Sequence, residues 1–242
     1  MKKDSFYFLH TPKTAGRFFT HNIVVPLDPI LLKNGVHNFY DRNTYVAHQH
    51  WAPFITDSTY IVNLFRDPIP HTVSAYCHFT MLSHDAQRKV PVGDERYSKH
   101  SMFDWLDKYE HSLSNFQSKS LLLSELGNNV KTYFDSQNMI ECVPTTTAVM
   151  EKINKVSLFL NSEDLAFSNV KKIHNKILDD FSIPRVDIKH SFQKHSNYWN
   201  PDSTRILNSL NDADKERILK WANIDAEIFH SNGLFFNIKE YE

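Results

Sequence analysis

The sequence predicts an α/β fold in which helices cover both faces of a central parallel sheet. Apolar runs at 6–9, 60–65 and 156–160 are rich in aromatic or β-branched residues, as buried strands are. A turn or cap signal and then a helical pattern follow each run. Alternation of strands with helices favours parallel pairing and a sheet covered on both sides. A chain of 242 residues with 41% hydrophobic content suits one sizeable core, so we expect a single domain over 1–242.

Prolines and polar caps set the expected elements of the first half. In order, we expect a strand over 6–9, a helix over about 17–24, a loop or short helix over 27–43, a short strand over 45–47, a strand over 60–65 and a helix over 68–82. Pro26 should stop the first helix, because proline lacks the N–H that a helix interior uses. Pro68 suits a first helical turn, and Asp67 is a suitable cap before it.

Capping residues and apolar spacing set the second half. We expect a helix that starts after Ser101, a helix over 115–126 ended by Gly127, a strand over 156–160, a helix capped by Asn161 or Ser162, and an amphipathic helix over about 211–221 with Ile218, Leu219 and Ala222 inward. In the helix after the last strand, helical spacing predicts a core-facing stripe of Val170, Ile173, Ile177 and Phe181. The polar segments 84–100 and 184–201 are expected to be loops.

The stretch 10–18 places an anion-binding turn directly after the first strand. The N–H groups and the dipole of a helix N-terminus favour negative charge. Lys13 adds a mobile cation, Thr14 offers a hydroxyl, and Gly16 allows a close main-chain approach. The spacing differs from the P-loop of ATP- and GTP-binding proteins, where the lysine follows a glycine. In this loop the one glycine follows the lysine.

Two motifs resemble those of the PAPS-dependent sulfotransferases, which use 3′-phosphoadenosine 5′-phosphosulfate (PAPS). The run His-Thr-Pro-Lys-Thr-Ala-Gly at 10–16 resembles the 5′-phosphosulfate loop of that family, usually His-Ile-Pro-Lys-Thr-Ala-Gly-Thr. The run at 66–76 resembles its 3′-phosphate motif, Arg-Asp-Pro-x-x-Arg-x-x-Ser-x-Tyr. The chain departs from the family at Arg17, where Thr or Ser is usual, and at His71, where Arg is frequent.

Two further segments are similar to the heparan sulfate 2-O-sulfotransferase branch. His48 and His50 stand in a His-x-His pair, of which one member in that branch is the base for the acceptor hydroxyl. Asn115 and Gln117 open a run similar to Asn-x-Gln-Thr-Arg-x-Leu-x-Gly. The resemblance extends from about residue 6 to residue 127.

The resemblance implies a P-loop-like sulfotransferase fold, with PAPS at the carboxyl ends of the strands and a hydroxyl, of a carbohydrate, as acceptor. Lys13 would stabilise the leaving 5′-phosphate, and His48 or His50, the latter slightly preferred, would be the base. The nucleotide-binding residues it implies are Lys13, Thr14, Ala15, Gly16, Arg17, Phe18, Arg66 and Ser74. Asn115 and Gln117 would line the acceptor pocket or fix the loops, and 194–197 would contact the nucleotide.

Composition excludes several other classes. A net charge of −1 gives no basic field, so nucleic acid is not an expected partner. The chain has no apolar run of about 20 residues and no signal peptide, so we expect a cytoplasmic protein without a membrane segment. Cys77 and Cys142 have neither disulfide nor metal spacing, and no third ligand joins His48 and His50, so no metal is expected. The sequence leaves the oligomeric state open.

Two other interpretations stay open. A nucleotide-dependent kinase of related fold would need the Gly-Lys-Ser/Thr run and an acidic metal-binding motif, which the chain lacks. A nucleotide-binding protein that has lost catalysis is compatible with the departures at Arg17 and His71. The sequence does not identify the acceptor, although the His-x-His pair favours a sugar by analogy.

Overall fold

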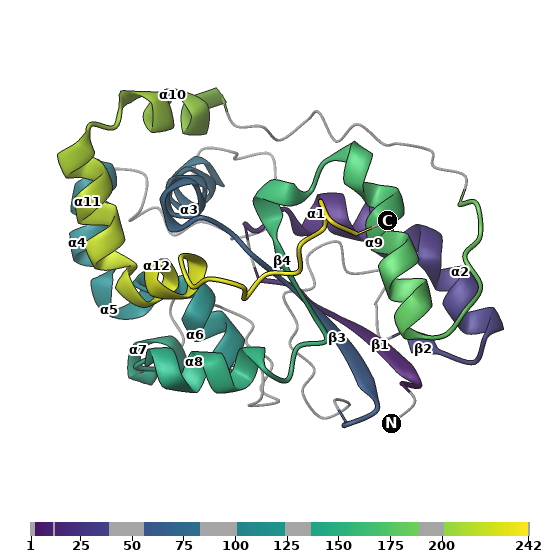
Figure 1. Cartoon of the computed structure of the whole chain (residues 1–242). Coiled ribbons are helices and arrows are strands. Elements are labelled where there is room, and N and C mark those ends of the chain that lie inside the picture. Colours follow the sequence, from purple (N-terminus) through teal and green to yellow (C-terminus); the bar gives the residue numbers. More distant parts are fainter. Residues whose placement is uncertain are drawn as a thin grey trace.

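The computed structural model describes residues 3–11, 13–38, 56–82, 101–123, 137–188 and 201–241. Within these ranges, β1 (Ser5–Leu9), β2 (His37–Asn38), β3 (Thr59–Phe65) and β4 (Leu158–Asn161) form one sheet in the order β2-β1-β3-β4. All neighbouring strands are parallel. The predicted α/β fold with a parallel sheet is confirmed (Figure 1).

Helices follow the strands along the chain. The described helical segments are α1 (Gly16–Phe19), the π-helical turn η1 (Thr20–Val24), α2 (Val25–Lys33), α3 (Pro68–Leu82), α4 (Met102–Lys108), α5 (Glu110–Leu113), α6 (Phe116–Leu123), α7 (Gln137–Glu141), α8 (Thr146–Ile153), the 3-10 turn η4 (Ser162–Asp164), α9 (Phe167–Asp180), α10 (Pro201–Ser209), α11 (Asp212–Trp221) and α12 (Asn223–Phe229). Among the described residues, no helix combines the length and the apolar character that crossing a membrane requires.

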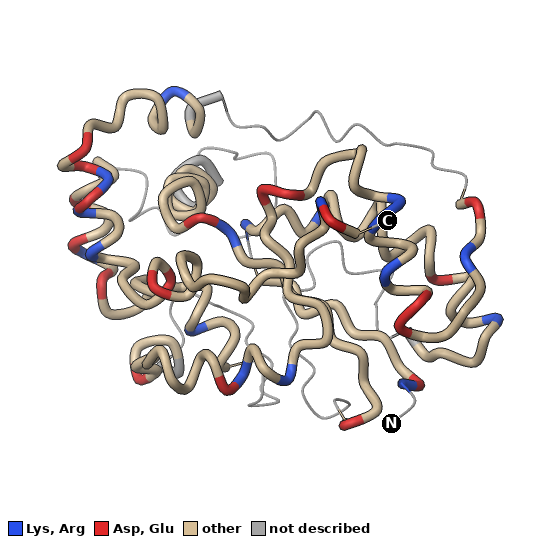
Figure 2. The backbone as a smooth tube through the Cα atoms, viewed as in Figure 1, with Lys and Arg blue, Asp and Glu red and all other residues tan. Residues whose placement is uncertain are grey.

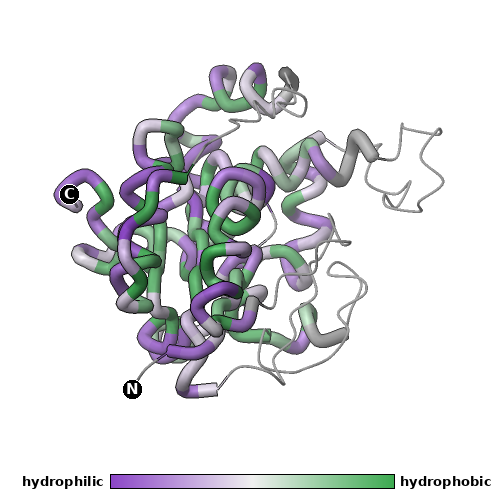
Figure 3. The backbone as a smooth tube through the Cα atoms, turned by 90° about the vertical axis from the view of Figure 1, so that its right-hand side faces the viewer, coloured by the Kyte–Doolittle hydropathy of each residue, from purple (hydrophilic) through white to green (hydrophobic). Residues whose placement is uncertain are grey.

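Helices cover both faces of the sheet. Alternate residues of β3 point to opposite faces, so each set packs against a different group of helices. Tyr60, Val62 and Leu64 pack in one cluster with α2 and α9, whereas Ile61 and Phe65 pack in another with α6, α8 and α12. Figure 1 shows these two groups of helices on either side of the strands. Figure 3 shows the hydrophobic positions gathered along the strands and the inner sides of the helices. A strand buried on both faces explains the unbroken apolar run at 60–62.

A third cluster lies among helices beyond the sheet. The fully buried Trp105 of α4 is its largest member, and α3 and α11 pack around it. The indole of Trp105 makes an edge-on contact with the phenol ring of Tyr76 and a tilted contact with the indole of Trp221. In Figure 2, both acidic and basic residues lie along α11.

The first helix runs past Pro26 to Lys33, and the prediction that it stops near Pro26 was wrong. The wider π-turn η1 explains the difference: the Val25 N–H donates to the Thr20 carbonyl, five residues back. Pro26 then falls in the first turn of α2, where its missing N–H costs nothing. The Asn22 side-chain amide donates to the Phe18 carbonyl at 3.0 Å, which gives that carbonyl a partner in the π-turn.

Several caps match the prediction. The helix predicted over 68–82 has those bounds, and the Asp67 carboxylate accepts from the Ile69 N–H at 2.8 Å. Ser101 caps α4 as predicted, whereas the capping box that Asn211 forms with Asp214 on α11 was not predicted. The predicted cap at Asn161 belongs instead to η4, and α9 begins only at Phe167.

The apolar stripes match in part. Val170, Ile173, Ile177 and Phe181 are buried as predicted. In α11 and just beyond it, Ile218 and Ala222 are buried, whereas Leu219 is only half-buried. The helices α5, α7, α8, α10 and α12 and the short strand β2 were not predicted.

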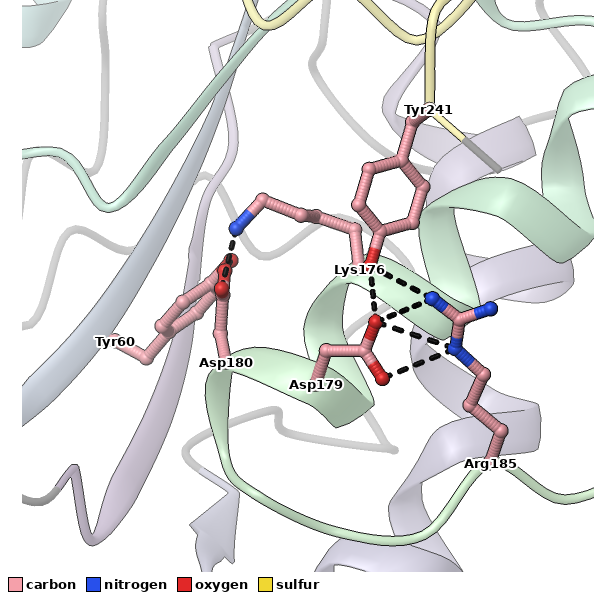
Figure 4. A network of polar contacts seen from close by, with 6 residues as sticks. All are labelled: Tyr60, Lys176, Asp179, Asp180, Arg185 and Tyr241. Atoms are coloured by element: carbon pink, nitrogen blue, oxygen red, sulfur yellow. Dashed lines mark hydrogen bonds and ion pairs between the residues drawn. The ribbon is translucent and has the colours of Figure 1, made fainter.

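Polar contacts fasten the C-terminal end of the chain to α9 and the sheet (Figure 4). Asp180 accepts from the Tyr60 hydroxyl at 2.5 Å and pairs with Lys176. Asp179 accepts from the Arg185 guanidinium at 2.7 Å and from the Tyr241 hydroxyl. The C-terminal segment also lies against β4, where the Phe236 N–H donates to the Phe159 carbonyl at 2.9 Å. Residues 236–241 are therefore held against α9 and the edge strand β4.

Candidate functional site

The two motif segments meet at the carboxyl edge of the sheet. Leu9 pairs with Asn63 in the ladder between β1 and β3, so the loop after β1 and the turn after β3 leave the sheet side by side. The guanidinium of Arg66 donates from Nη1 to the main-chain oxygen of Lys13 at 3.4 Å. Segments 53 residues apart in the sequence are thus in direct contact. Open α/β sheets generally bind their ligands at this edge.

The loop after β1 has a backbone suited to an anion. Lys13 and Ala15 have positive φ angles of 69° and 62°, which are uncommon for residues other than glycine. A left-handed residue followed by a right-handed one, as at Ala15 and Gly16, turns successive N–H groups toward one point. The first hydrogen bond of the helix runs from the Phe19 N–H to the Ala15 carbonyl, so the N–H groups before it have no acceptor within the helix.

Side chains below the loop hold its shape. Thr14 is fully buried, and its hydroxyl donates to the Thr11 carbonyl at 2.7 Å. The buried amide of Asn63 donates to the Leu9 carbonyl at 2.8 Å and to the Thr11 hydroxyl at 3.3 Å. The Thr14 hydroxyl proton is therefore used inside the loop. Sequence reasoning missed Asn63, although a lone amide within an apolar strand is a signal.

Positive charge is concentrated at this edge. Lys13 is half-buried, and burial, followed by the nearby Arg17 and Arg66, lowers its pKa to about 8. Arg66 also donates from Nε to a Glu163 carboxylate oxygen at 3.0 Å, just beyond β4. Lys13, Arg17 and Arg66 therefore bring three cations to this edge. Such a concentration of positive charge favours a multiply charged anion.

The turn that carries Arg66 is clamped by a buried amide. The Gln117 side chain accepts from the Arg66 N–H at 2.8 Å and donates to the Arg66 carbonyl at 2.9 Å. Gln117 is fully buried, so these two bonds are shielded from water. Of the two roles expected for Gln117, the geometry accords with holding a loop.

The remaining expected residues are placed differently. Ser74 lies half-buried in the second turn of α3, on the helix that follows the Arg66 turn. His71 is 2% exposed and stacks on Phe116 with 5.9 Å between ring centroids. The imidazole of His71 is therefore packed in the interior, where the family motif frequently has an arginine. His48, His50 and the segment 194–197 lie outside the described residues.

The site as built suits a phosphate or sulfate ester. It offers the N–H groups at the start of α1, the ammonium of Lys13 and the guanidinium groups of Arg17 and Arg66. All of them lie in the segments that follow β1 and β3. In the described ranges, no group of three or more His, Cys, Asp or Glu side chains is arranged to hold a metal ion. Comparisons of the chain with protein-family models, with curated proteins and with solved structures find no match.

Proposed function

We propose that the protein is a PAPS-dependent sulfotransferase that transfers a sulfuryl group to a hydroxyl, and that this hydroxyl belongs to a carbohydrate. The observation that carries the proposal is the contact between the Arg66 guanidinium and the Lys13 carbonyl. It joins the two segments whose sequences resemble the 5′-phosphosulfate and 3′-phosphate motifs. A P-loop-like sulfotransferase fold, with nucleotide at the carboxyl ends of β1 and β3, is part of the same proposal.

The two motif segments would grip opposite ends of the nucleotide. The N–H groups at 15–18 and the ammonium of Lys13 bind the 5′-phosphosulfate, and Arg17 adds a second cation. Arg66 binds the 3′-phosphate, since a guanidinium can donate two parallel hydrogen bonds to one phosphate. Ser74 adds a hydroxyl from α3.

The transfer is an in-line displacement at sulfur. The acceptor hydroxyl oxygen forms a bond to sulfur while the bond between sulfur and the bridging oxygen breaks, and the electron pair stays on the 5′-phosphate. Lys13 stabilises the negative charge that develops on this leaving group. His48 or His50 accepts the hydroxyl proton. Positioning and electrostatics account for most of the catalysis, as in phosphoryl transfer.

One observation favours a second candidate, a nucleotide-binding protein without catalysis: His71, where the family motif frequently has an arginine, is packed in the interior against Phe116. The ion pair of Arg66 bears on both candidates. The Arg66 guanidinium already has a carboxylate partner in Glu163, whose side chain is 48% exposed. A phosphate would have to share or displace that carboxylate. Exposed ion pairs contribute only about 0–1 kcal/mol, so a dianionic phosphate can compete with Glu163.

Thermal unfolding with different nucleotides separates the candidates. Adenosine 3′,5′-bisphosphate at about 100 times its dissociation constant should stabilise the protein by roughly 2.7 kcal/mol and raise the melting temperature by several degrees. A shift with ATP and magnesium alone would instead identify a kinase. No shift with either nucleotide would refute the proposed donor.

Transfer of radiolabelled sulfate from PAPS to a panel of glycans then tests catalysis. The variants His48→Ala and His50→Ala should lower the transfer rate while nucleotide affinity is kept, and normal turnover in both would assign the base elsewhere. A protein that binds the bisphosphate but labels no acceptor in the panel would match the non-catalytic candidate.

A further inference from the structure

Two helices far apart in the sequence cap each other. The Asn115 side-chain oxygen accepts from the main-chain N–H groups of Ile224 at 2.8 Å and Asp225 at 3.2 Å, in the first turn of α12. In return, the Asp225 carboxylate accepts from the N–H groups of Gln117 at 3.1 Å and Ser118 at 2.8 Å, in the first turn of α6. The N-termini of α6 and α12 therefore supply each other's acceptors, a role that a local residue usually plays.

Of the two capping residues, Asn115 and Asp225, the latter is the more deeply buried. Its side chain is 2% exposed, and it also accepts from the Ser118 hydroxyl at 2.5 Å. A buried carboxylate is stable only when hydrogen bonds replace its lost hydration. The first turn of α6 is thus fixed by a group that loses much free energy if it moves.

The first turn of α6 also carries Gln117, which holds Arg66, the residue proposed to bind the 3′-phosphate. Gln117 donates its own N–H to Asp225, and its side chain holds both main-chain groups of Arg66. The pairing of β3 with β4 ends at Phe65, so the Arg66 N–H and carbonyl lie beyond the sheet ladder. Gln117 provides the partners that this ladder does not.

We propose that Asp225 and Gln117 are positioning residues for Arg66: Asp225 fixes the first turn of α6, and Gln117 transmits this to the Arg66 main chain. The effect on phosphate binding rests on the proposed function, in which Arg66 grips the 3′-phosphate. Neither residue contacts the nucleotide. They fix the position of the Arg66 main chain, from which the side chain extends toward the phosphate. A displaced guanidinium would lose its paired hydrogen bonds to phosphate.

A pair of nucleotides distinguishes positioning from general support of the fold. Adenosine 3′,5′-bisphosphate carries the phosphate that Arg66 would bind, and adenosine 5′-monophosphate does not. By calorimetry, Gln117→Leu should weaken the bisphosphate about tenfold and leave the monophosphate unchanged within about twofold. Equal weakening of both nucleotides would overturn the positioning role. Ser157→Ala is the matched control, because it removes a side-chain acceptor at 3.1 Å from a different main-chain N–H, that of Ile61 in β3, and leaves the clamp on Arg66 in place. It should leave the affinity for both nucleotides unchanged.

A double-mutant cycle sharpens the same test. Arg66→Ala removes the guanidinium but keeps the main-chain groups that Gln117 holds. In this background, Gln117→Leu should weaken the bisphosphate no further, because the group that it positions is absent. Additive losses in the double variant would show that Gln117 acts on the nucleotide by another route.

Hydrogen exchange tests the coupling without any nucleotide, so it can be judged even if the proposed function fails. In Gln117→Leu the Arg66 N–H loses its acceptor, and in Asp225→Ala that acceptor is no longer held in place. In both variants the Arg66 amide should therefore exchange about tenfold faster than in the wild type. The amide of Val62, in the centre of β3, reports global unfolding and corrects for lost stability. If the Arg66 amide keeps its protection relative to Val62 in Asp225→Ala, Asp225 does not position Arg66. A wild-type protein that binds no bisphosphate would refute the sulfotransferase proposal and leave this exchange result to decide the coupling.

Discussion

Gly16 lies directly against the imidazole ring of His10. A Cβ built on Gly16 would be 1.8 Å from His10 Nε2, far inside any permitted contact. Position 16 requires a glycine because His10 approaches so closely, and not because of a positive φ. The loop residues with positive φ are Lys13 and Ala15. His10 in turn stacks on Phe8 of β1, with ring centroids 5.5 Å apart. The start of the first helix is thus packed against the end of the first strand.

Gly16→Ala should therefore disturb the anion loop. Overpacking of this kind costs about 1–3 kcal/mol, and the displaced imidazole would move the loop with it. We expect a lower unfolding free energy in urea and weaker binding of adenosine 3′,5′-bisphosphate. The double variant His10→Ala with Gly16→Ala should regain part of the stability, because the clash is gone. Wild-type stability in Gly16→Ala alone would contradict the close contact.

Lys13→Ala should strongly slow sulfate transfer without loss of the fold. Removal of a group that stabilises the leaving phosphate is expected to lower the transfer rate by about 10²–10³-fold. The melting temperature should not fall, because Lys13 is half-buried beside two other cations. The assay is transfer of radiolabelled sulfate from PAPS, and retained activity would exclude the assigned role.

The lowered pKa of Lys13 predicts a pH dependence of nucleotide binding. With a pKa of about 8, the ammonium is charged at pH 7 and mostly neutral at pH 9. Affinity for adenosine 5′-monophosphate should therefore fall as the pH rises through 8. In Lys13→Arg the guanidinium stays charged, and the calorimetric affinity should vary little over the same range. An unchanged pH profile in Lys13→Arg would point to another titrating group.

Arg66 and Glu163 should have opposite effects on the 3′-phosphate. Arg66→Ala should weaken adenosine 3′,5′-bisphosphate by about 1.5–3 kcal/mol and adenosine 5′-phosphosulfate, which lacks the 3′-phosphate, far less. Glu163→Gln removes the competing carboxylate at 3.0 Å and should tighten the bisphosphate severalfold. Calorimetry of both variants with both ligands checks this pair, and equal losses of the two ligands in Arg66→Ala would reject the assignment.

Asp225 should make stability depend on pH. Burial raises its pKa from 3.8 to about 6, against the hydrogen bonds from Ser118 and Gln117 that favour the ionised form. The folded protein therefore binds this proton more tightly than the unfolded chain. The resulting stabilisation is complete below about pH 4 and is lost as the pH rises through 6.

Two pKa units correspond to about 3 kcal/mol. In Asp225→Asn the side chain does not titrate, so the stability of the wild type relative to this variant should fall by about that amount between pH 4 and pH 7.5. Urea unfolding at a series of pH values measures the difference. Parallel stability curves for the two proteins would contradict the raised pKa.

Local signals predicted much of the framework. The strands β1 and β3 and the helix α3 came from apolar runs followed by a cap or a proline, features that act within a few residues. The first helix was predicted too short because Pro26 signals a stop only if the turn before it is α-helical. The π-turn at 20–24 removes that conflict, and no residue type marks such a turn in the sequence.

The contacts that arrange the site depend on distant residues and could not be predicted from a single sequence. Arg66 and Ser74 were chosen by resemblance, but the pairing of Arg66 with Glu163 joins residues 97 apart. The role of Gln117 in holding Arg66 spans 51 positions, and that of Asp225 in holding α6 spans 108. Asn63 was recognisable as an amide in an apolar strand, yet its partners in the loop became visible only with the register of β1 against β3.

The mutual capping of α6 and α12 also orders events during synthesis. Translation at about 5–20 residues per second separates Arg66 from Asp225 by roughly 10–30 s. The bond between Thr14 and Thr11 spans three positions, so the anion loop can acquire its internal contact soon after it emerges. The Arg66 turn obtains its full support only when α12, which carries Asp225, has formed. On the proposed function, the nascent chain can therefore bind nucleotide in full only after Asp225 has been synthesised and α12 has formed.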